Sequence, residues 1–472
     1  MRAVSTSPDT PGARRHALQP FVLGIAVFLV GLGMTPDRAA SQPQRADATA
    51  QAFTNAVLID GTGAAAVEHA TVVVRGDRIV AAGPAASVSI PGGARVTDLR
   101  GKVLMPGLAD MHVHLMGGWD GVASDMLGYR RYMSALLYAG VTTVLDTGNV
   151  EPFIVQLRAE VAAGRLPGPR IYCVGPLIDG ADPAWPPLSR AVASVGQVPD
   201  VVRALSRDHV DLIKAYVGLS HPVLERLVEE GRKASLRVII DQWQRNGSPD
   251  LVADGIYGFA HLPTRKLSST DVELMRDRKV AFISTLAVFE SESRRRLANL
   301  TFLQDPLVRD TSPPKFLEGL RAEAARKLTS EQAERAQRGV GMLQNAMANA
   351  RALVQSGVLL TAGTDAPYPG DMQGEGLHRE LELLVEAGFT PLEAISIATQ
   401  NAARFIGAND WGTVQPGKLA TLIVVDGRPD RDISQTRRMV GVYVAGKKID
   451  RDSLQIARQN DPGFEPISPV DF

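Results

Sequence analysis

The order of strand-like and helix-like patterns between residues 106 and 405 constrains the fold more than any other feature of this chain. Short apolar runs typical of buried strands alternate with helical patterns such as 222–233 and 391–405. The eight strand-like runs are 105–115, 141–146, 170–174, 210–214, 237–241, 258–261, 280–286 and 358–365. Eight strands alternating with helices are the number that a (β/α)8 barrel requires. The pattern therefore predicts an α/β fold, a TIM barrel over residues 106–405.

Short β-rich runs flank this alternating region on both sides. They are 55–59, 70–75 and 78–82 before it, and 420–425 and 441–445 after it. Neither end has enough strands to be stable alone. We therefore expect a small composite β-sandwich domain built from residues 53–105 and 406–450, followed by a C-terminal tail over 451–472.

The first 41 residues have the pattern of an export signal. Arg14 and Arg15 precede an apolar run, 21–34, which is too short to span a membrane as a mature helix. Small residues at positions 39–41 then resemble a cleavage site. We expect a signal peptide over 1–41, export to a bacterial periplasm, and no membrane attachment after cleavage. The arginine pair raises the twin-arginine route as well as the general one, and an uncleaved anchor is the alternative.

Charge and cysteine content exclude several classes of protein. The chain has 51 basic and 51 acidic residues, so its formal net charge is zero and no nucleic-acid partner is expected. Its one cysteine, Cys173, rules out an internal disulfide and a cysteine-based metal cluster. We expect a small-molecule substrate, and a homo-oligomer is left open.

Polar residues lie where the predicted strands end. His112 and His114 are two residues apart, so on one strand both imidazoles point to the same face and can reach one ion. The other strand-end residues are Lys214, Asp241, His261 and Asp365. In barrels of this type, the active site forms at the C-terminal ends of the strands. These six residues are therefore the candidate site.

Several motifs together resemble the amidohydrolase superfamily, in its imidazolonepropionase and prolidase-like branch. They include Met-Pro-Gly-Leu-Ala-Asp-Met-His-Val-His over 105–114, Asp-Leu-Ile-Lys-Ala-Tyr over 211–216, Gly-Phe-Ala-His over 258–261 and Gly-Thr-Asp-Ala-Pro over 363–367. They occur in the expected order over nearly the whole chain after residue 50. The resemblance implies one or two divalent ions at the barrel mouth and hydrolysis of amide, lactam or ester bonds.

The resemblance also implies a role for each candidate. His112, His114 and Asp365 supply the nitrogen and oxygen ligands that Zn²⁺ accepts while a position stays open for water. The lysine matching Lys214 reacts with carbon dioxide in this family, and the carbamate bridges two metals; the alternative is a lysine paired with a carboxylate. His261 would bind the second metal or instead polarise the substrate. Asp365 would also be the catalytic base.

Asp241 departs from the family pattern, which usually has a metal-binding histidine on the fifth strand. A carboxylate can replace an imidazole as a ligand, so Asp241 is a candidate for the second metal. Alternatively, the second metal is absent and Asp241 orients a neighbouring residue. Both interpretations stay open.

Aromatic residues follow several predicted strands and suggest an apolar or aromatic ligand face. They are Trp119, Trp185, Tyr216, Trp243 and Tyr368. The long stretch 287–356 contains a predicted helix over 331–354 and suggests a lid or a subunit contact. The sequence as a whole predicts an exported metal-dependent hydrolase of amide or peptide C–N bonds in dipeptides or N-acyl amino acids. A single-metal lactonase or esterase and a catalytically inactive ligand-binding protein are the alternatives.

Overall fold

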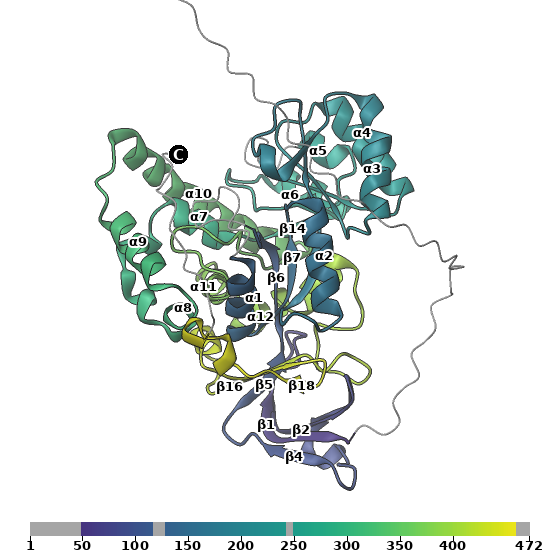
Figure 1. Cartoon of the computed structure of the whole chain (residues 1–472), viewed down its shortest axis with the longest axis vertical. Coiled ribbons are helices and arrows are strands. Elements are labelled where there is room, and N and C mark those ends of the chain that lie inside the picture. The colour runs from purple at the N-terminus through teal and green to yellow at the C-terminus, as the bar shows by residue number, and fades with distance from the viewer. Residues whose placement is uncertain (1–48, 117–127, 242–248, 459–472) are drawn as a thin grey trace, which may run out of the picture. The chain divides into compact units, whose positions relative to one another are not determined.

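A computed structural model describes residues 49–116, 128–241 and 249–458 (Figure 1). The predicted signal peptide over 1–41, Trp119, Trp243 and residues 459–472 of the predicted tail lie outside these ranges. Among the described residues, no helix has both the length and the apolar character that a membrane crossing requires.

Strands from both ends of the chain form one sheet, as the sequence predicts. Its members are β1 (Gln51–Leu58), β2 (Val67–Arg75), β3 (Arg78–Pro84), β4 (Arg95–Asp98), β5 (Val103–Pro106), β16 (Leu422–Val425), β17 (Met439–Val444) and β18 (Lys447–Lys448). The strand order is β18-β17-β16-β5-β1-β2-β3, with β4 beside β1. The two ends meet where β5 pairs antiparallel with β16, Leu422 opposite Pro106. Two facing sheets, which a sandwich requires, stay a prediction, as do the domain boundaries.

The alternation of side chains along these strands explains why this sheet is covered on both faces. Leu422 and Val424 of β16 pack in one apolar cluster with Phe53 of β1. The intervening Ile423 and Val425 pack in the main core of the molecule. The sheet is therefore attached to the rest of the protein by an apolar interface.

The middle of the chain forms parallel sheets, which confirms the predicted α/β class. One sheet contains β6 (Leu108–Val113), β7 (Val141–Asp146) and β8 (Arg170–Cys173). The other has the order β10 (Ser189–Ala191), β9 (Leu177–Asp179), β11 (Ile213–Ala215), β12 (Val238–Ile240), β13 (Gly258–Phe259), β14 (Ala281–Ile283) and β15 (Leu360–Thr361). Each of the eight predicted runs overlaps one of these strands. All the pairings are parallel.

Backbone hydrogen bonds connect the two parallel sheets at both edges of the smaller one. The amide of Asp211, just before β11, donates to the carbonyl of Cys173 in β8 at 2.8 Å. On the other side, the amide of Met111 in β6 donates to the carbonyl of Ala362, just after β15, at 2.9 Å. The strand ends that carry the candidate residues are thereby held next to each other.

Helices lie between most of the parallel strands, with four between β14 and β15 and three after β15. They are α1 (Tyr129–Tyr138), α2 (Glu151–Ala162), α3 (Val198–Arg207), α4 (His221–Lys233), α5 (Pro249–Ala253), α6 (Ser269–Asp277), α7 (Leu286–Glu292), α8 (Pro306–Arg309), α9 (Pro314–Ala325), α10 (Ser330–Gln355), α11 (Glu375–Glu386), α12 (Pro391–Ile397) and α13 (Gln400–Ile406). The predicted long helix over 331–354 is confirmed as α10. It begins at a capping box, because Thr329 Oγ1 accepts from the amide of Gln332 and the Gln332 side chain accepts from the amide of Thr329. The role of 287–356 as a lid or subunit contact stays a prediction.

The predicted helix over 391–405 is wrong as a single element, since it is divided into α12 and α13. The carbonyl of Ala398 accepts a hydrogen bond from the amide of Ala109 in β6 at 2.8 Å. Thr399 Oγ1 donates to the carbonyl of Ile395 at 2.7 Å and so satisfies another group at the end of α12. The break therefore joins the last helices to the strand that carries the paired histidines.

Candidate metal centre

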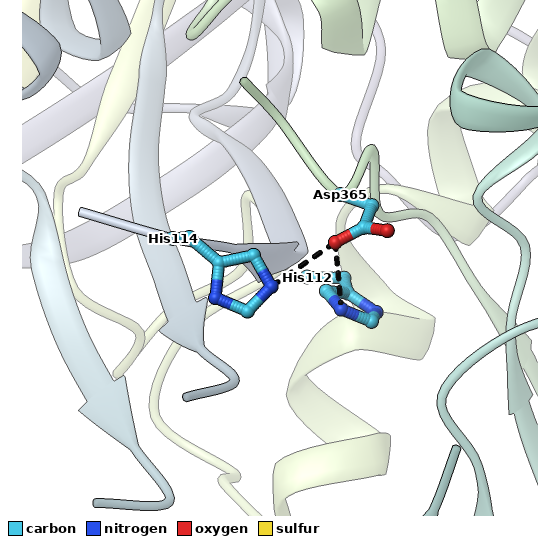
Figure 2. A group of neighbouring side chains, drawn as sticks. All are labelled: His112, His114 and Asp365. Carbon is cyan, nitrogen blue, oxygen red and sulfur yellow. Dashed lines mark hydrogen bonds and ion pairs between the residues drawn. The ribbon is translucent and has the colours of Figure 1, made fainter. Parts of the chain in front are cut away.

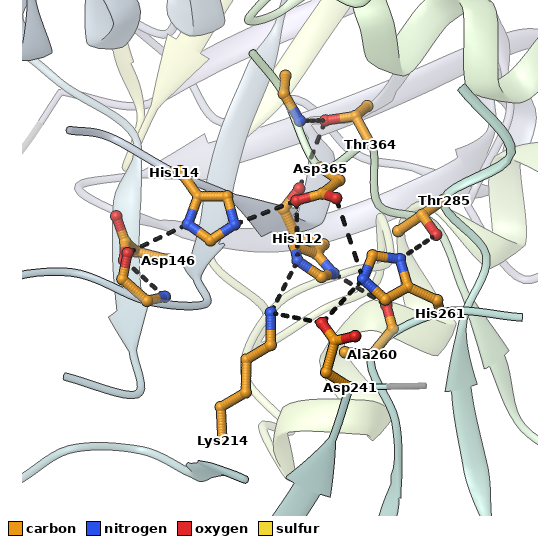
Figure 3. Close-up of polar contacts among 12 residues, drawn as sticks. His112, His114, Asp146, Lys214, Asp241, Ala260, His261, Thr285, Thr364 and Asp365 are labelled. Atoms are coloured by element: carbon orange, nitrogen blue, oxygen red, sulfur yellow. Dashed lines mark hydrogen bonds and ion pairs between the residues drawn. The ribbon is translucent and has the colours of Figure 1, made fainter. Parts of the chain in front are cut away.

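The six predicted residues converge at the C-terminal ends of parallel strands (Figure 3). His112 lies in β6 and His114 follows it, and Lys214 lies in β11. The other three residues, Asp241, His261 and Asp365, follow β12, β13 and β15. This edge is where residues from separate strands meet in a parallel α/β fold. All six side chains are buried except that of His114, which is partly exposed.

Asp365 lies between the paired histidines (Figure 2). Its Oδ1 atom is 3.1 Å from His112 Nε2 and 3.1 Å from His114 Nε2. The three residues can each offer one ligand atom, with all of these atoms within 4.8 Å of one another. Two imidazole nitrogens and one carboxylate oxygen are a ligand set typical of Zn²⁺.

The other ring nitrogens indicate which tautomers these histidines adopt. His112 Nδ1 is 2.9 Å from the carbonyl of Ala260, and His114 Nδ1 is 3.1 Å from the carbonyl of Gly148. A carbonyl can only accept, so each Nδ1 carries a hydrogen and each neutral ring has its Nε2 lone pair toward Asp365. Two nitrogen lone pairs and an anionic oxygen repel one another unless a proton or a cation lies between them. The donor set therefore fits a divalent metal ion.

The pKa shifts show which charges this arrangement favours. Burial, with the positive charge of Lys214, lowers the pKa of His112 to about 3, so its imidazole is neutral. Burial would lower the pKa of His114, but the hydrogen bond and charge of Asp365 outweigh it and raise that pKa. Burial is also outweighed at Asp365, where the histidines hold the pKa of the carboxyl well below its usual range. The space between His114 Nε2 and Asp365 Oδ1 thus favours a positive charge, which a bound metal ion would supply.

Lys214, Asp241 and His261 form the second half of the site. Lys214 Nζ is 3.2 Å from His112 Nε2 and 3.5 Å from Asp241 Oδ2. His261 Nε2 is 3.2 Å from the same Asp241 oxygen and 4.0 Å from Asp365 Oδ2. Asp241 supplies the carboxylate partner that the alternative interpretation of Lys214 requires. Its contact with His261 is compatible both with a ligand and with an orienting role.

Asp365 has a backbone conformation that suits a functional position. Its φ of 71° lies in the left-handed region, which residues other than glycine seldom adopt. Its amide donates to the carbonyl of His112 at 2.7 Å, which fixes the carboxylate relative to β6. Strained residues of this kind are concentrated at active sites.

Two buried carboxylates support the histidines and were not among the predicted site residues. Asp110 accepts from the amide of His112 at 3.2 Å and from Thr364 Oγ1 at 2.8 Å, and burial raises its pKa to about 7. Asp146 accepts from the amide of Leu115 at 2.9 Å. The sequence could have identified both as residues near the site, because Asp110 is two residues before His112 and Asp146 is the last residue of a predicted strand.

Three of the predicted aromatic residues, Trp185, Tyr216 and Tyr368, line the pocket at this site. The pocket is also lined by Leu177 and Leu188. Trp185 Nε1 donates to the hydroxyl of Tyr216 at 2.8 Å. The described part of the pocket therefore offers an apolar wall beside the polar centre.

A second group, His221, Glu225 and Asp254, also offers one ligand atom per residue with these atoms within 4.8 Å of one another, but its observed contacts use both ring nitrogens of His221. His221 Nδ1 is 3.3 Å from Asp254 Oδ2, whereas its Nε2 is 3.7 Å from Glu225 Oε1. The two ring nitrogens point in different directions, so one ion cannot replace both contacts. In this structure the group is an ion-pair arrangement between the exposed residues His221 and Glu225 of α4 and Asp254, which follows α5.

Comparison with known proteins gives matches over most of the chain. Residues 103–252 and 297–449 match the family model described as Amidohydrolase family. The imidazolonepropionase of Shouchella clausii is 24% identical over 85% of this chain and 92% of that protein. The adenine deaminase of Petrotoga mobilis is 32% identical over 22% of this chain, a segment that spans only 17% of that relative. A solved Xaa-Pro dipeptidase has a TM-score of 0.68 at 21% identity and covers 85% of this chain and 100% of its own.

Proposed function

The chain belongs to the amidohydrolase family, as its sequence motifs predict, and we propose that it is a metal-dependent hydrolase that cleaves amide-type C–N bonds. The observation that carries this proposal is the set of His112 Nε2, His114 Nε2 and Asp365 Oδ1, because two lone pairs face an anionic oxygen. The hydrogen bonds at both edges of the smaller parallel sheet support closure of the strands into a (β/α)8 barrel.

The site residues would divide binding and proton transfer between them. His112, His114 and Asp365 would hold one divalent ion, Zn²⁺ in our proposal, and Lys214, Asp241 and His261 would hold a second. When bound, the metal polarises a carbonyl and makes a water more acidic. Asp365 would accept the proton of the attacking water at Oδ2 and return it to the leaving nitrogen.

We propose that Lys214 is carbamylated in the active protein. As an ammonium, its Nζ lies 3.2 Å from His112 Nε2 and uses the lone pair that a metal ion needs. Addition of carbon dioxide to the amine, with loss of protons from nitrogen, replaces this competing cation by an anion with two ligand oxygens. A buried lysine is also less costly once its positive charge is removed.

A single-metal lactonase or esterase is the second candidate function. Among the described residues of the site, His112, His114 and Asp365 form the compact group of possible ligands. Asp241 is at the position where the family resemblance implies a metal-binding histidine. This difference between the two halves of the site is the observation that supports the single-metal candidate. Such an enzyme would lose no metal when Asp241 is replaced.

The proposal also covers the class of substrate and the location of the protein in the cell. Dipeptides and N-acyl amino acids are the proposed substrates, and the apolar wall of Leu177, Leu188 and Trp185 would bind a side chain or acyl group. The pattern over residues 1–41 supports export to a periplasm.

The test combines elemental analysis with a substrate panel of dipeptides, N-acyl amino acids, lactones and aryl esters. The metal-loaded protein should hydrolyse amide substrates, lose this activity on chelation and regain it when Zn²⁺ is restored. His112→Asn should lose metal and activity. His209→Asn is the matched control, since His209 is exposed and has a left-handed backbone that asparagine tolerates. A metal-loaded protein that hydrolyses no member of the panel would favour the inactive ligand-binding alternative.

A further inference from the structure

His261 differs from the paired histidines in the group that faces its Nδ1 atom. His112 and His114 each have a backbone carbonyl there, which can only accept a hydrogen bond. His261 Nδ1 instead lies 2.8 Å from Thr285 Oγ1 (Figure 3). A hydroxyl can donate or accept, so this contact is compatible with a hydrogen on either ring nitrogen.

The two tautomers place different groups toward the centre of the site. In the first, Thr285 donates to Nδ1, and the hydrogen on Nε2 is donated to Asp241 Oδ2 at 3.2 Å. In the second, Nδ1 donates to Thr285, and the Nε2 lone pair is directed at the centre. The change moves one hydrogen from Nε2 to Nδ1 and rotates one hydroxyl. The ring stays neutral and its bond to Thr285 is kept.

The backbone around Thr285 is fixed, so its hydroxyl is held in place. Thr285 has a φ of 45°, in the left-handed region, and its amide donates to the carbonyl of Gly363 at 3.1 Å. Glu380 of α11 holds both sides of the turn, because its carboxylate accepts from Ser284 Oγ and from the amide of Ala287. A rare conformation held from both sides indicates a constraint on this side chain.

We propose that Thr285 is a positioning residue that lets His261 change from a hydrogen-bond donor to Asp241 into a metal ligand. The metal-binding part rests on the proposed function, whereas the tautomer part concerns the protein without metal. Without a hydroxyl at residue 285, the Nδ1 hydrogen of the metal-binding tautomer would be buried without this partner. His261 would then keep its hydrogen on Nε2 and stay bonded to Asp241.

The test compares Thr285→Val, which keeps the shape but removes the hydroxyl, with Thr285→Ser, which keeps the hydroxyl. Titration with Zn²⁺ against a chelator should show affinity for the second ion falling about tenfold or more in Thr285→Val, as for other groups that orient metal ligands. Thr285→Ser should bind with affinity close to wild type. Nitrogen-15 NMR of the His261 ring should show the Nε2–H form in Thr285→Val both before and after Zn²⁺ is added. In wild type the same measurement should show the Nδ1–H form after Zn²⁺ is added.

The inference would be overturned if wild type and Thr285→Val bound the second ion with equal affinity. It would also be overturned if Thr285→Val and Thr285→Ser both lost affinity for that ion. If Thr285→Val does not fold, judged by circular dichroism, Thr285→Ala replaces it with the same expectations. If wild type binds fewer than two ions, the two-metal function is wrong. The role of Thr285 in positioning His261 is then tested by NMR of the metal-free proteins. An Nδ1 shift altered in Thr285→Val but not in Thr285→Ser supports the hydrogen bond by which Thr285 positions His261, and an Nδ1 shift unaltered in both refutes it.

Discussion

Replacing Glu380 by glutamine should change how the stability of this protein depends on pH. Glu380 is fully buried in α11, where its Oε2 accepts from the amide of Ala287 at 2.7 Å and its Oε1 from Ser284 Oγ. Burial raises the pKa of its carboxyl from 4.5 to about 8, even though these hydrogen bonds act in the opposite direction. In Glu380→Gln, the amide oxygen can still accept from Ala287 and the amide nitrogen can donate to Ser284 Oγ.

The direction and size of this pH dependence follow from the linkage between proton binding by Glu380 and the free energy of unfolding. An acid with a raised folded-state pKa contributes stability that is fully present below its unfolded pKa and lost as pH rises through the folded one. One pKa unit corresponds to 1.36 kcal/mol, so a rise from 4.5 to about 8 corresponds to ~5 kcal/mol, of which ~3 kcal/mol is lost by pH 7. The glutamine side chain does not ionise, so Glu380→Gln should not show this loss.

Urea unfolding of the metal-free proteins, between pH 4 and pH 8, measures the effect. The free energy of unfolding of wild type minus that of Glu380→Gln should fall by several kcal/mol across this range. Glu318→Gln is the control, because Glu318 is exposed on α9 and the same chemical change should leave the difference flat. A difference for Glu380→Gln that is also independent of pH would refute the reasoning.

Four further predictions concern the site and the sheet. Lys214→Ala should lose metal and activity, with partial rescue of both by short carboxylic acids; unchanged metal content by elemental analysis would contradict the carbamate. Asp241→Ala should remove one ion per chain and Asp241→His should retain it, whereas equal metal content in wild type and both variants would favour the single-metal enzyme. A chain ending at residue 408 should be insoluble because β5 loses its partner β16, and a soluble fragment with a cooperative melt would disprove this. Asp371→Asn should raise the urea midpoint more at pH 8 than at pH 5, since burial raises the pKa of Asp371 well above its usual range and neither carboxylate oxygen has a hydrogen-bond partner among the described residues; a lower midpoint at pH 8 would refute it.

The strands and the six strand-end residues could be predicted because their signals are local. An apolar run identifies a buried strand, and the rule that strand ends meet brings Lys214 beside His112 across 102 positions of sequence. Thr285 and Glu380 carry no such signal, because their importance depends on contacts that only the folded chain makes. The same holds for the break at Ala398, where a tertiary hydrogen bond to Ala109 overrides a continuous helical pattern.

The pairing of β5 with β16 has a consequence for the order of events during synthesis. Residues 103–106 leave the ribosome about 300 residues before residues 422–425, which at roughly 5–20 residues per second is a delay of about 15–60 s. During this time β5 lacks the neighbour that completes its edge, although β6 with His112 and His114 begins just after it. The free edge of β5 can therefore be paired only after β16 has been synthesised. A pause in translation before residue 422 prolongs the period in which this edge of the nascent chain can pair with other chains.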